Sequence, residues 1–207
     1  MTEAITVPAR AAWLSWRLPG VLVLSLVLGG ATSWGQFLLP DWIVSIANSS
    51  SGWTLITALL VFVARLPLWP SVVAGAGSFV LLTVGYAVVS DWRGFSYDPT
   101  FFVVVGVIVG PFVGAAAAWI RGRGVPAALA SALLAGIGVG EAVYGVTVVA
   151  DSTSPVYWWI IGSAGVLLLG GMTGWRLRGV HPRVIAVVGT LLVAGAFLAT
   201  YTTSWSF

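Results

Sequence analysis

The chain has 207 residues, of which 59% are hydrophobic and 7% charged, and its mean hydropathy is +1.03. One soluble domain cannot bury that much apolar surface, so the composition predicts an integral membrane protein. A helix needs roughly 20 apolar residues to cross a hydrocarbon core about 30 Å thick, so the length allows about six or seven crossings and little else. The net charge of +3 reflects membrane topology rather than nucleic-acid binding.

Missing residue types exclude several kinds of chemistry. Without cysteine there are no disulfides, thiolate metal sites or iron–sulfur clusters. Without lysine there is no Schiff base to pyridoxal phosphate or retinal. A single histidine, His181, cannot build a multi-histidine metal site. We therefore expect no cofactor, no metal and no enzymatic activity.

Seven runs without charge mark the predicted membrane spans, and together they predict an all-α polytopic bundle. Residues 1–17 are expected to form a short cytoplasmic tail, and residues 18–207 a single bundle domain. The predicted spans are 18–39, 52–65, 68–90, 99–120, 125–150, 155–175 and 184–204.

The charges give the orientation. With seven spans, eight of the nine basic residues fall on one side of the membrane, and these are Arg10, Arg17, Arg65, Arg121, Arg123, Arg176, Arg178 and Arg183. The positive-inside rule makes that side, and the N-terminus, cytoplasmic. The remaining arginine lies outside with four aspartates, namely Arg93, Asp41, Asp91, Asp98 and Asp151.

The second span is short, because only Gly52 to Arg65 is continuously apolar. In one interpretation Asp41–Ala47 lies at the membrane interface and the crossing starts near Ser50, whose hydroxyl caps the first amides. In the other interpretation the segment is a broken or re-entrant element. Irregular backbone at membrane depth is tolerated only where protein or a cavity surrounds it, so the second interpretation would mark a binding site. The interfacial interpretation is the simpler one.

Glu141 is the one ionisable residue well inside a predicted span. Asp151 ends that span ten residues later, which puts Glu141 roughly 15 Å below the outer surface, near the midplane. A charge there costs at least a few kcal/mol, so Glu141 should face the bundle interior or a watery cavity. It could exchange protons or bind a solute. Alternatively it could bridge two helices through hydroxyl groups, with Tyr144 as the nearest candidate.

The chain is rich in tryptophan, with 12 residues, and those near the outer surface are interspersed with carboxylates. Trp53 and Asp41 belong to this outer set. An aromatic belt at the membrane interface explains the pattern most simply. A cage for an organic cation is the functional alternative.

Small residues recur at four-residue spacing, most plainly Gly106, Gly110 and Gly114 in the fourth span. Such a face lets two helices approach closely. Packing within the bundle is the simpler interpretation, and a dimer interface the alternative. The loop from Arg176 to Arg183 could contact anionic lipid headgroups or a soluble partner such as an ATPase, although topology alone explains its charge.

Several short motifs resemble a family of actinobacterial multi-pass membrane proteins of unknown function. They are Ile46–Ser49, Arg65–Trp69, Val84–Tyr86, Gly110–Gly114 and Glu141–Tyr144, spread over roughly residues 20–175. The resemblance implies a membrane fold in a bacterial cell membrane and supplies no activity. It also implies that seven residues belong to one constellation, namely Asn48, Gly85, Tyr86, Gly110, Pro111, Glu141 and Tyr144.

Two functions are consistent with these features. The first is binding or transport of a small solute, with a cation as one candidate, in a pocket formed by Glu141, Tyr144, Tyr86, Asn48, Asp41 and Trp53. The second is a structural or accessory subunit of a larger membrane complex, with no solute site of its own. The sequence offers no nucleic-acid partner in either case, and the lipid bilayer is the expected environment in both.

Overall fold

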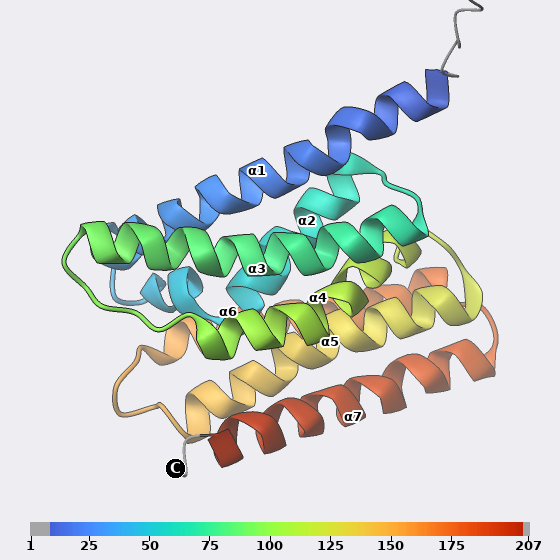
Figure 1. Ribbon diagram of the computed structural model, residues 1–207. Helices are drawn as coiled ribbons and strands as arrows, with labels where there is room; N and C mark the ends of the chain where they lie inside the picture. Colours follow the sequence, from blue (N-terminus) through green and yellow to red (C-terminus); the bar gives the residue numbers. More distant parts are fainter. Residues whose placement is uncertain (1–8, 205–207) are drawn as a thin grey trace, which may run out of the picture.

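The computed structural model describes residues 9–204, and its side chains are described from residue 16 to 202. This part of the chain is helical and contains no strand, which confirms the predicted all-α fold (Figure 1). Seven α-helices follow one another: α1 (Ala9–Leu38), α2 (Ser50–Ala64), α3 (Leu68–Trp92), α4 (Thr100–Trp119), α5 (Gly124–Thr147), α6 (Pro155–Gly171) and α7 (Val180–Ser204). A 3-10 helix, η1 (Val44–Asn48), precedes α2, and a π-helical turn, η2 (Met172–Arg176), ends α6.

Six of the helices are long and apolar enough to cross a membrane, so the chain is a multi-pass membrane protein. Helix α2 differs, because its 15 residues extend only about 22 Å, less than the roughly 30 Å of a hydrocarbon core. The helices match the predicted spans to within a few residues, except that α1 begins at Ala9 and so includes part of the predicted tail.

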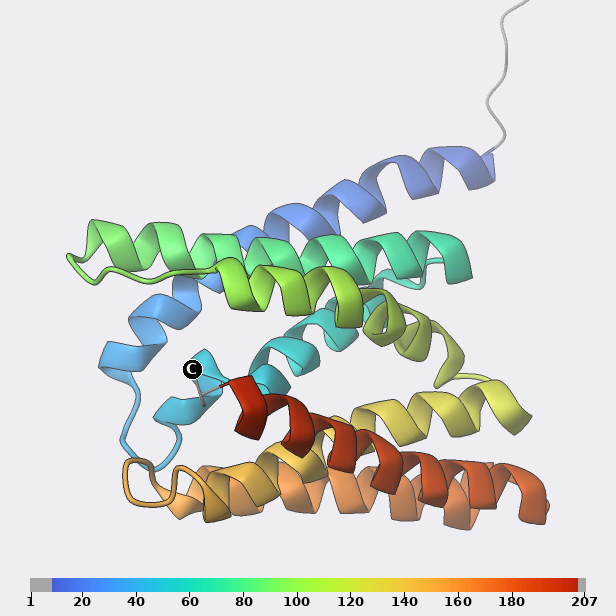
Figure 2. The ribbon, with the colours of Figure 1, turned by 60° about the horizontal axis from the view of Figure 1, so that its bottom comes forward.

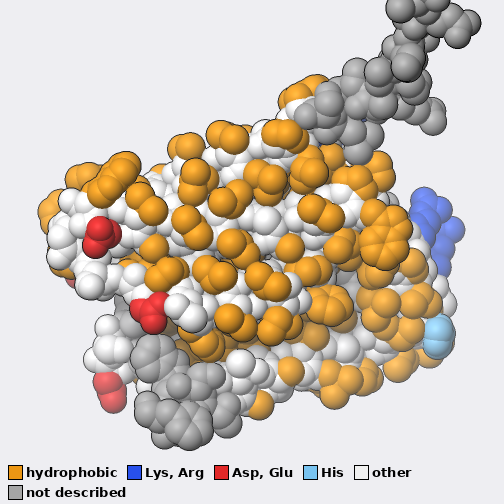
Figure 3. All heavy atoms as spheres, in the orientation of Figure 1, with side chains coloured by type: hydrophobic (Ala, Val, Ile, Leu, Met, Phe, Trp, Pro, Cys, Tyr) orange, Lys and Arg blue, Asp and Glu red, His pale blue; other side chains and the backbone are white. Residues whose placement is uncertain are grey.

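The arginines, with one exception, and the aspartates lie at opposite ends of the bundle, as the charge pattern predicts (Figure 3). We call one end the arginine end; the described arginines there are Arg17, Arg65, Arg121, Arg123, Arg176, Arg178 and Arg183. The other is the acidic end, with Asp41, Asp91, Asp98 and Asp151 and, as predicted, Arg93. The side chain of Arg10 lies outside the described residues.

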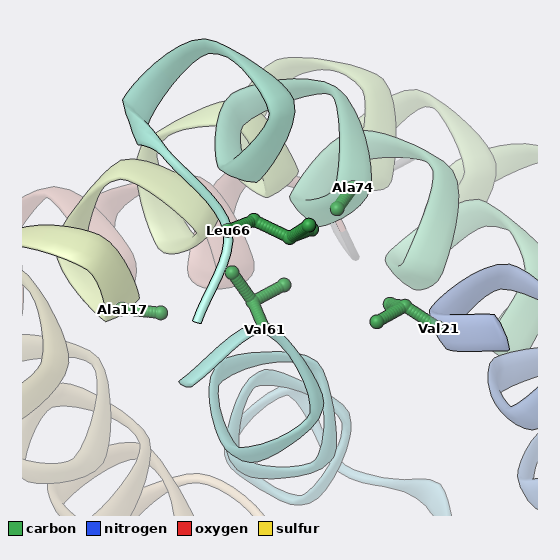
Figure 4. Close-up of a cluster of buried hydrophobic side chains, with 5 residues drawn as sticks. All are labelled: Val21, Val61, Leu66, Ala74 and Ala117. Carbon is green, nitrogen blue, oxygen red and sulfur yellow. The ribbon is translucent and has the colours of Figure 1, made fainter. Parts of the chain in front are cut away.

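The long helices form two groups of three. Helix α3 packs between α1 and α4, and α5 packs between α6 and α7. Helix α2 lies between the two groups (Figure 2). Near the arginine end Val61 of α2 points into a buried cluster with Val21, Leu66, Ala74 and Ala117, which joins α2 to α1, α3 and α4 (Figure 4).

Glycines allow α3 and α4 to touch backbone to backbone. A Cβ atom at Gly114 would lie 1.9 Å from the carbonyl oxygen of Ser71, and one at Gly75 would lie 2.2 Å from that of Gly110. Gly106 likewise packs against α3. The glycine face of α4 therefore serves packing inside the bundle and is not available to a second subunit.

Helices α1 and α3 are joined by small polar residues at a similarly close crossing. The Ser25 hydroxyl donates to the Ser78 hydroxyl at 2.7 Å, and the hydroxyls of Ser33 and Ser90 lie 2.8 Å apart. Between these pairs a Cβ atom at Gly29 would meet the α3 backbone at 2.1 Å. In lipid, such packing and hydrogen bonding hold helices together because apolar side chains gain little from leaving lipid.

We predict that Gly114→Ala destabilises the protein, by about 1–3 kcal/mol, because the added methyl group overpacks the α3–α4 contact. The matched control is Gly170→Ala in α6, where a Cβ atom would meet nothing within 4 Å. Both changes remove a helical glycine, so both gain the same helix propensity, about 1 kcal/mol. Thermal unfolding of the purified variants measures the difference. Equal melting temperatures would contradict the packing account.

Candidate functional site

The chain enters the bundle between η1 and α2. Asp41 is exposed at the acidic end and Trp42 is 50% exposed. Beyond η1 the side chains become buried: Ser49, Ser50, Ser51, Trp53 and Thr54 are each at most 5% exposed. The short helical turn η1 and the start of α2 at Ser50 agree with the interfacial interpretation, but the break between them is enclosed by the protein.

The first four amides of α2 all have hydrogen-bond acceptors. The Ser50 amide donates to Glu141 Oε1 at 2.8 Å, and the Ser51 amide donates to Glu141 Oε2 at 2.6 Å. The Gly52 amide donates to the Ser49 hydroxyl at 2.9 Å, and the Trp53 amide to the Ser49 carbonyl at 3.1 Å. These amides have no partner within the helix itself, so every one of them is satisfied from outside it or by its cap. The cap is Ser49 and not, as predicted, Ser50.

Glu141 thus bridges two helices, but through backbone amides rather than the expected hydroxyls. Its carboxyl group, on α5, binds the N-terminus of α2 with both oxygens. The partial positive charge at a helix N-terminus favours a carboxylate there, and charge-assisted hydrogen bonds are about twice as strong as neutral ones. Glu141 lies six residues before the end of α5, about 9 Å, so it is in the acidic half of the bundle and not at the midplane.

Two tyrosine hydroxyls complete the contacts of this helix start. Tyr157 of α6 lies 2.6 Å from the Ser49 hydroxyl, and Tyr201 of α7 forms a short hydrogen bond with the Ser50 hydroxyl. All three helices of the α5–α6–α7 group therefore hold the N-terminus of α2. We call Glu141, Tyr157 and Tyr201 the clasp.

The middle and the C-terminal end of α2 are bound by the α1–α3–α4 group. The Arg17 guanidinium of α1 donates to the Ala64 carbonyl at 2.9 Å, and Ser78 of α3 donates to Thr57 at 3.2 Å. One short helix thus contacts both groups, although Trp53 in its first turn also packs against α3.

The predicted site residues fall into three places. Tyr144 is half-buried, with its ring 5.6 Å from that of Tyr201 in the clasp. Tyr86 and Trp53 contact each other at 5.7 Å in a separate buried cluster, and Tyr86 donates to Gln36 of α1.

Two phenylalanine rings connect the rings around Tyr201 with the cluster that contains Trp53 and Tyr86. Phe101 lies 5.8 Å from Tyr201, Phe101 lies 5.1 Å from Phe102, and Phe102 lies 5.0 Å from Trp53. The side chains of Asn48 and Asp41, in contrast, are exposed outside this set. The structure therefore brings Glu141 and Tyr144 together around the start of α2, places Tyr86 and Trp53 at the far end of an aromatic row, and leaves Asn48 and Asp41 apart.

Sequence reasoning placed the start of α2 near Ser50 but missed the clasp tyrosines. The run Ser49-Ser50-Ser51-Gly52 carried a usable signal, because serines followed by an apolar run are typical of a helix start. Gly52 is required there, since a Cβ atom would lie 2.1 Å from the Ile46 carbonyl oxygen of η1. Nothing in the sequence linked this run to Tyr157 or Tyr201.

A cavity of about 260 Å³ adjoins the clasp. Its hydroxyl groups belong to Ser50, Thr54, Thr200 and Tyr201. The rest of its lining is apolar and comes from Phe79, Val105, Val109, Leu133, Ile137, Val193, Ala196 and Phe197. Among the described residues there is no group of His, Asp or Glu side chains that could hold a metal ion.

We predict that Glu141→Gln destabilises the protein by about 1–3 kcal/mol. A glutamine accepts from one α2 amide, but its own NH₂ faces the other and leaves that buried amide unpaired. Asp98→Asn is the matched control, because Asp98 also accepts from a backbone amide, that of Thr100 at 2.9 Å, but in an exposed loop. Thermal unfolding measures both. A Glu141→Gln variant as stable as the wild type would show that the two amide bonds contribute nothing.

The comparisons with known proteins identify the family and no activity. Searches of the curated proteins and of the solved structures return no significant match. The family model that matches covers residues 8–205, which includes every residue of the clasp and of the cavity. The chain belongs to DUF6518, a family of unknown function.

Proposed function

We propose that this membrane protein binds, and moves across the membrane, a small solute held in the cavity beside the clasp. The observation that carries the proposal is the buried break before α2, with a cavity against its first turn. Membrane transporters commonly form their substrate sites at discontinuous helices, because the freed backbone and helix ends can bind a ligand there.

The lining of the cavity favours a solute with an apolar body and one hydrogen-bonding group. Hydroxyls of Ser50, Thr54 and Tyr201 are the polar groups nearest the start of α2, and they both donate and accept. Glu141 does not line the cavity, and both its oxygens are bound by amides. A cationic solute would have to displace those amides, so a neutral solute fits better than the cation considered from sequence.

The arrangement of α2 also supports movement. Alternating access requires one group of helices to move against another around a fixed site. Here the two groups meet where α4 packs against α5 and through α2, and the clasp holds the N-terminal end of α2. We infer that release of the clasp allows the α5–α6–α7 group to move, in the cell membrane of a bacterium, as the resemblance to actinobacterial proteins suggests.

A structural or accessory subunit is the second candidate. It is favoured by the complete satisfaction of Glu141 by backbone amides, as expected of a carboxyl group with a purely structural role. The glycine face of α4 does not support it, because α3 already covers that face.

We predict that Ala196→Phe, which fills the cavity, abolishes solute binding while the protein stays folded. A thermal-shift screen of the purified protein against neutral and cationic metabolites measures this, because a ligand that binds the folded state raises the melting temperature. The control is Leu191→Phe, which adds a ring to the same helix at a position that is 66% exposed.

The two candidates give different results in this screen. A shift that occurs in wild type and Leu191→Phe but not in Ala196→Phe supports the solute site. A shift that survives in Ala196→Phe would place the solute elsewhere. No shift with any metabolite in any variant would contradict the solute site and favour the accessory subunit, for which co-purification of a partner is the next test.

A further inference from the structure

A second site combines the arginine end with a groove that lies on the other side of Thr54 and Ile137 from the proposed solute cavity. Helices α2 and α6 border an apolar groove of about 210 Å³ whose floor is α5. It is lined by Ser51, Thr54, Leu55, Ala58, Leu134, Ile137, Gly138, Ile161, Ala164, Gly165 and Leu168. Leu55 is 44% exposed, so this face of α2 opens sideways to the surroundings of the bundle.

Phe62 continues the groove toward the arginine end. It follows Ser51, Leu55 and Ala58 on the same face of α2, because residues spaced by three or four lie above one another on a helix. From Ser51 to Phe62 the face runs about 16 Å along the helix. The guanidinium of Arg121, in the loop after α4, lies 4.0 Å from the centre of the Phe62 ring.

Arg121 has a buried donor without an acceptor. Its Nη2 atom is shielded from solvent and has no hydrogen-bond partner among the described residues. Burial, followed by the charge of Arg65, lowers the pKa of the Arg121 guanidinium. Like charges repel each other, and a buried donor without an acceptor is costly, more so when it is charged.

Two less common backbone conformations lie beside Arg121 and hold further arginines there. Arg65 ends α2 with φ of 51°, a left-handed conformation in which glycine is the common residue. The π-helical turn η2 places Arg176 so that its guanidinium donates to the carbonyls of Arg121 and Gly122. Turns of this kind occur often at functional sites. Three loops thus bring three arginines together.

No acid is available here to balance the charge. Among the described residues the four aspartates lie at the acidic end, and Glu141 is bound to α2 inside the bundle. An anion from outside the protein is therefore the natural counter-charge.

We propose that Arg65 and Arg121 bind the phosphate group of an anionic phospholipid, whose acyl chain occupies the groove between α2 and α6. Arg65 and the partly exposed Arg121 supply the positive charge, and Arg176 holds the loop that carries Arg121. By the positive-inside rule this lipid belongs to the cytoplasmic leaflet. The occupant is a lipid rather than a free phosphate because an apolar groove lies on the same face of α2 as Phe62, the ring that Arg121 covers.

Native mass spectrometry of the purified protein tests the site, with phosphatidylglycerol and phosphatidylcholine of identical acyl chains added in turn. We expect preferential binding of phosphatidylglycerol, and a loss of affinity of about tenfold or more in Arg65→Gln and in Arg121→Gln. Arg123→Gln is the matched control, because it removes the same charge from an exposed position in the same loop. It should bind phosphatidylglycerol like the wild type.

A groove variant distinguishes a lipid from a free anion. Ala164→Phe adds a ring at an exposed position of the groove, where the helix tolerates it, and should weaken phosphatidylglycerol binding while the melting temperature stays unchanged. Inorganic phosphate should not protect the wild type against thermal unfolding. Equal losses in Arg121→Gln and Arg123→Gln, equal binding of the two lipids, or protection by phosphate with no effect of Ala164→Phe would each overturn the proposal.

Discussion

The pairing of Glu141 with the first amides of α2 is the interaction on which the rest of the structure depends. A helix that begins inside a membrane protein exposes amides that water cannot reach, and each unsatisfied amide is costly. Glu141 accepts from two of them, and Ser49 accounts for the next two. Without these acceptors, α2 could not start at this depth, and the chain could not turn inward after η1.

The position of α2 follows from this pairing and determines how the bundle is assembled. Strong glycine and serine contacts join α1 to α3 and α3 to α4, whereas α5 forms the centre of the other group. Helix α2 connects these groups through polar contacts at both ends. Polar contacts between helices are weak individually in membranes, about 1 kcal/mol or less on average. These polar contacts supplement the direct packing of α4 against α5, which also joins the two groups.

Much of the fold could be predicted from sequence, because charge-free runs and arginine positions are imposed by the bilayer itself. Glu141 could be singled out for the same reason, as a carboxyl group where water is scarce. Its hydrogen-bond partners could not be predicted, because they are backbone amides, which are present whatever the side chain. Tyr157 and Tyr201 were missed because they lie 108 and 151 residues from their serine partners. Asn48 and Asp41 were predicted to belong to the site because they are polar residues close to it in sequence, but their side chains are exposed.

Thiol labelling tests most directly whether the N-terminus of α2 is buried and held by Glu141. The chain has no native cysteine, so single cysteines can be placed at Asp41 and Ser51 and treated with a membrane-impermeant maleimide in nanodiscs. Asp41→Cys should react readily. Ser51→Cys, whose parent side chain is 4% exposed, should react far more slowly, and the additional change Glu141→Ala should accelerate it. Equal reaction at both positions, or no acceleration by Glu141→Ala, would contradict the account.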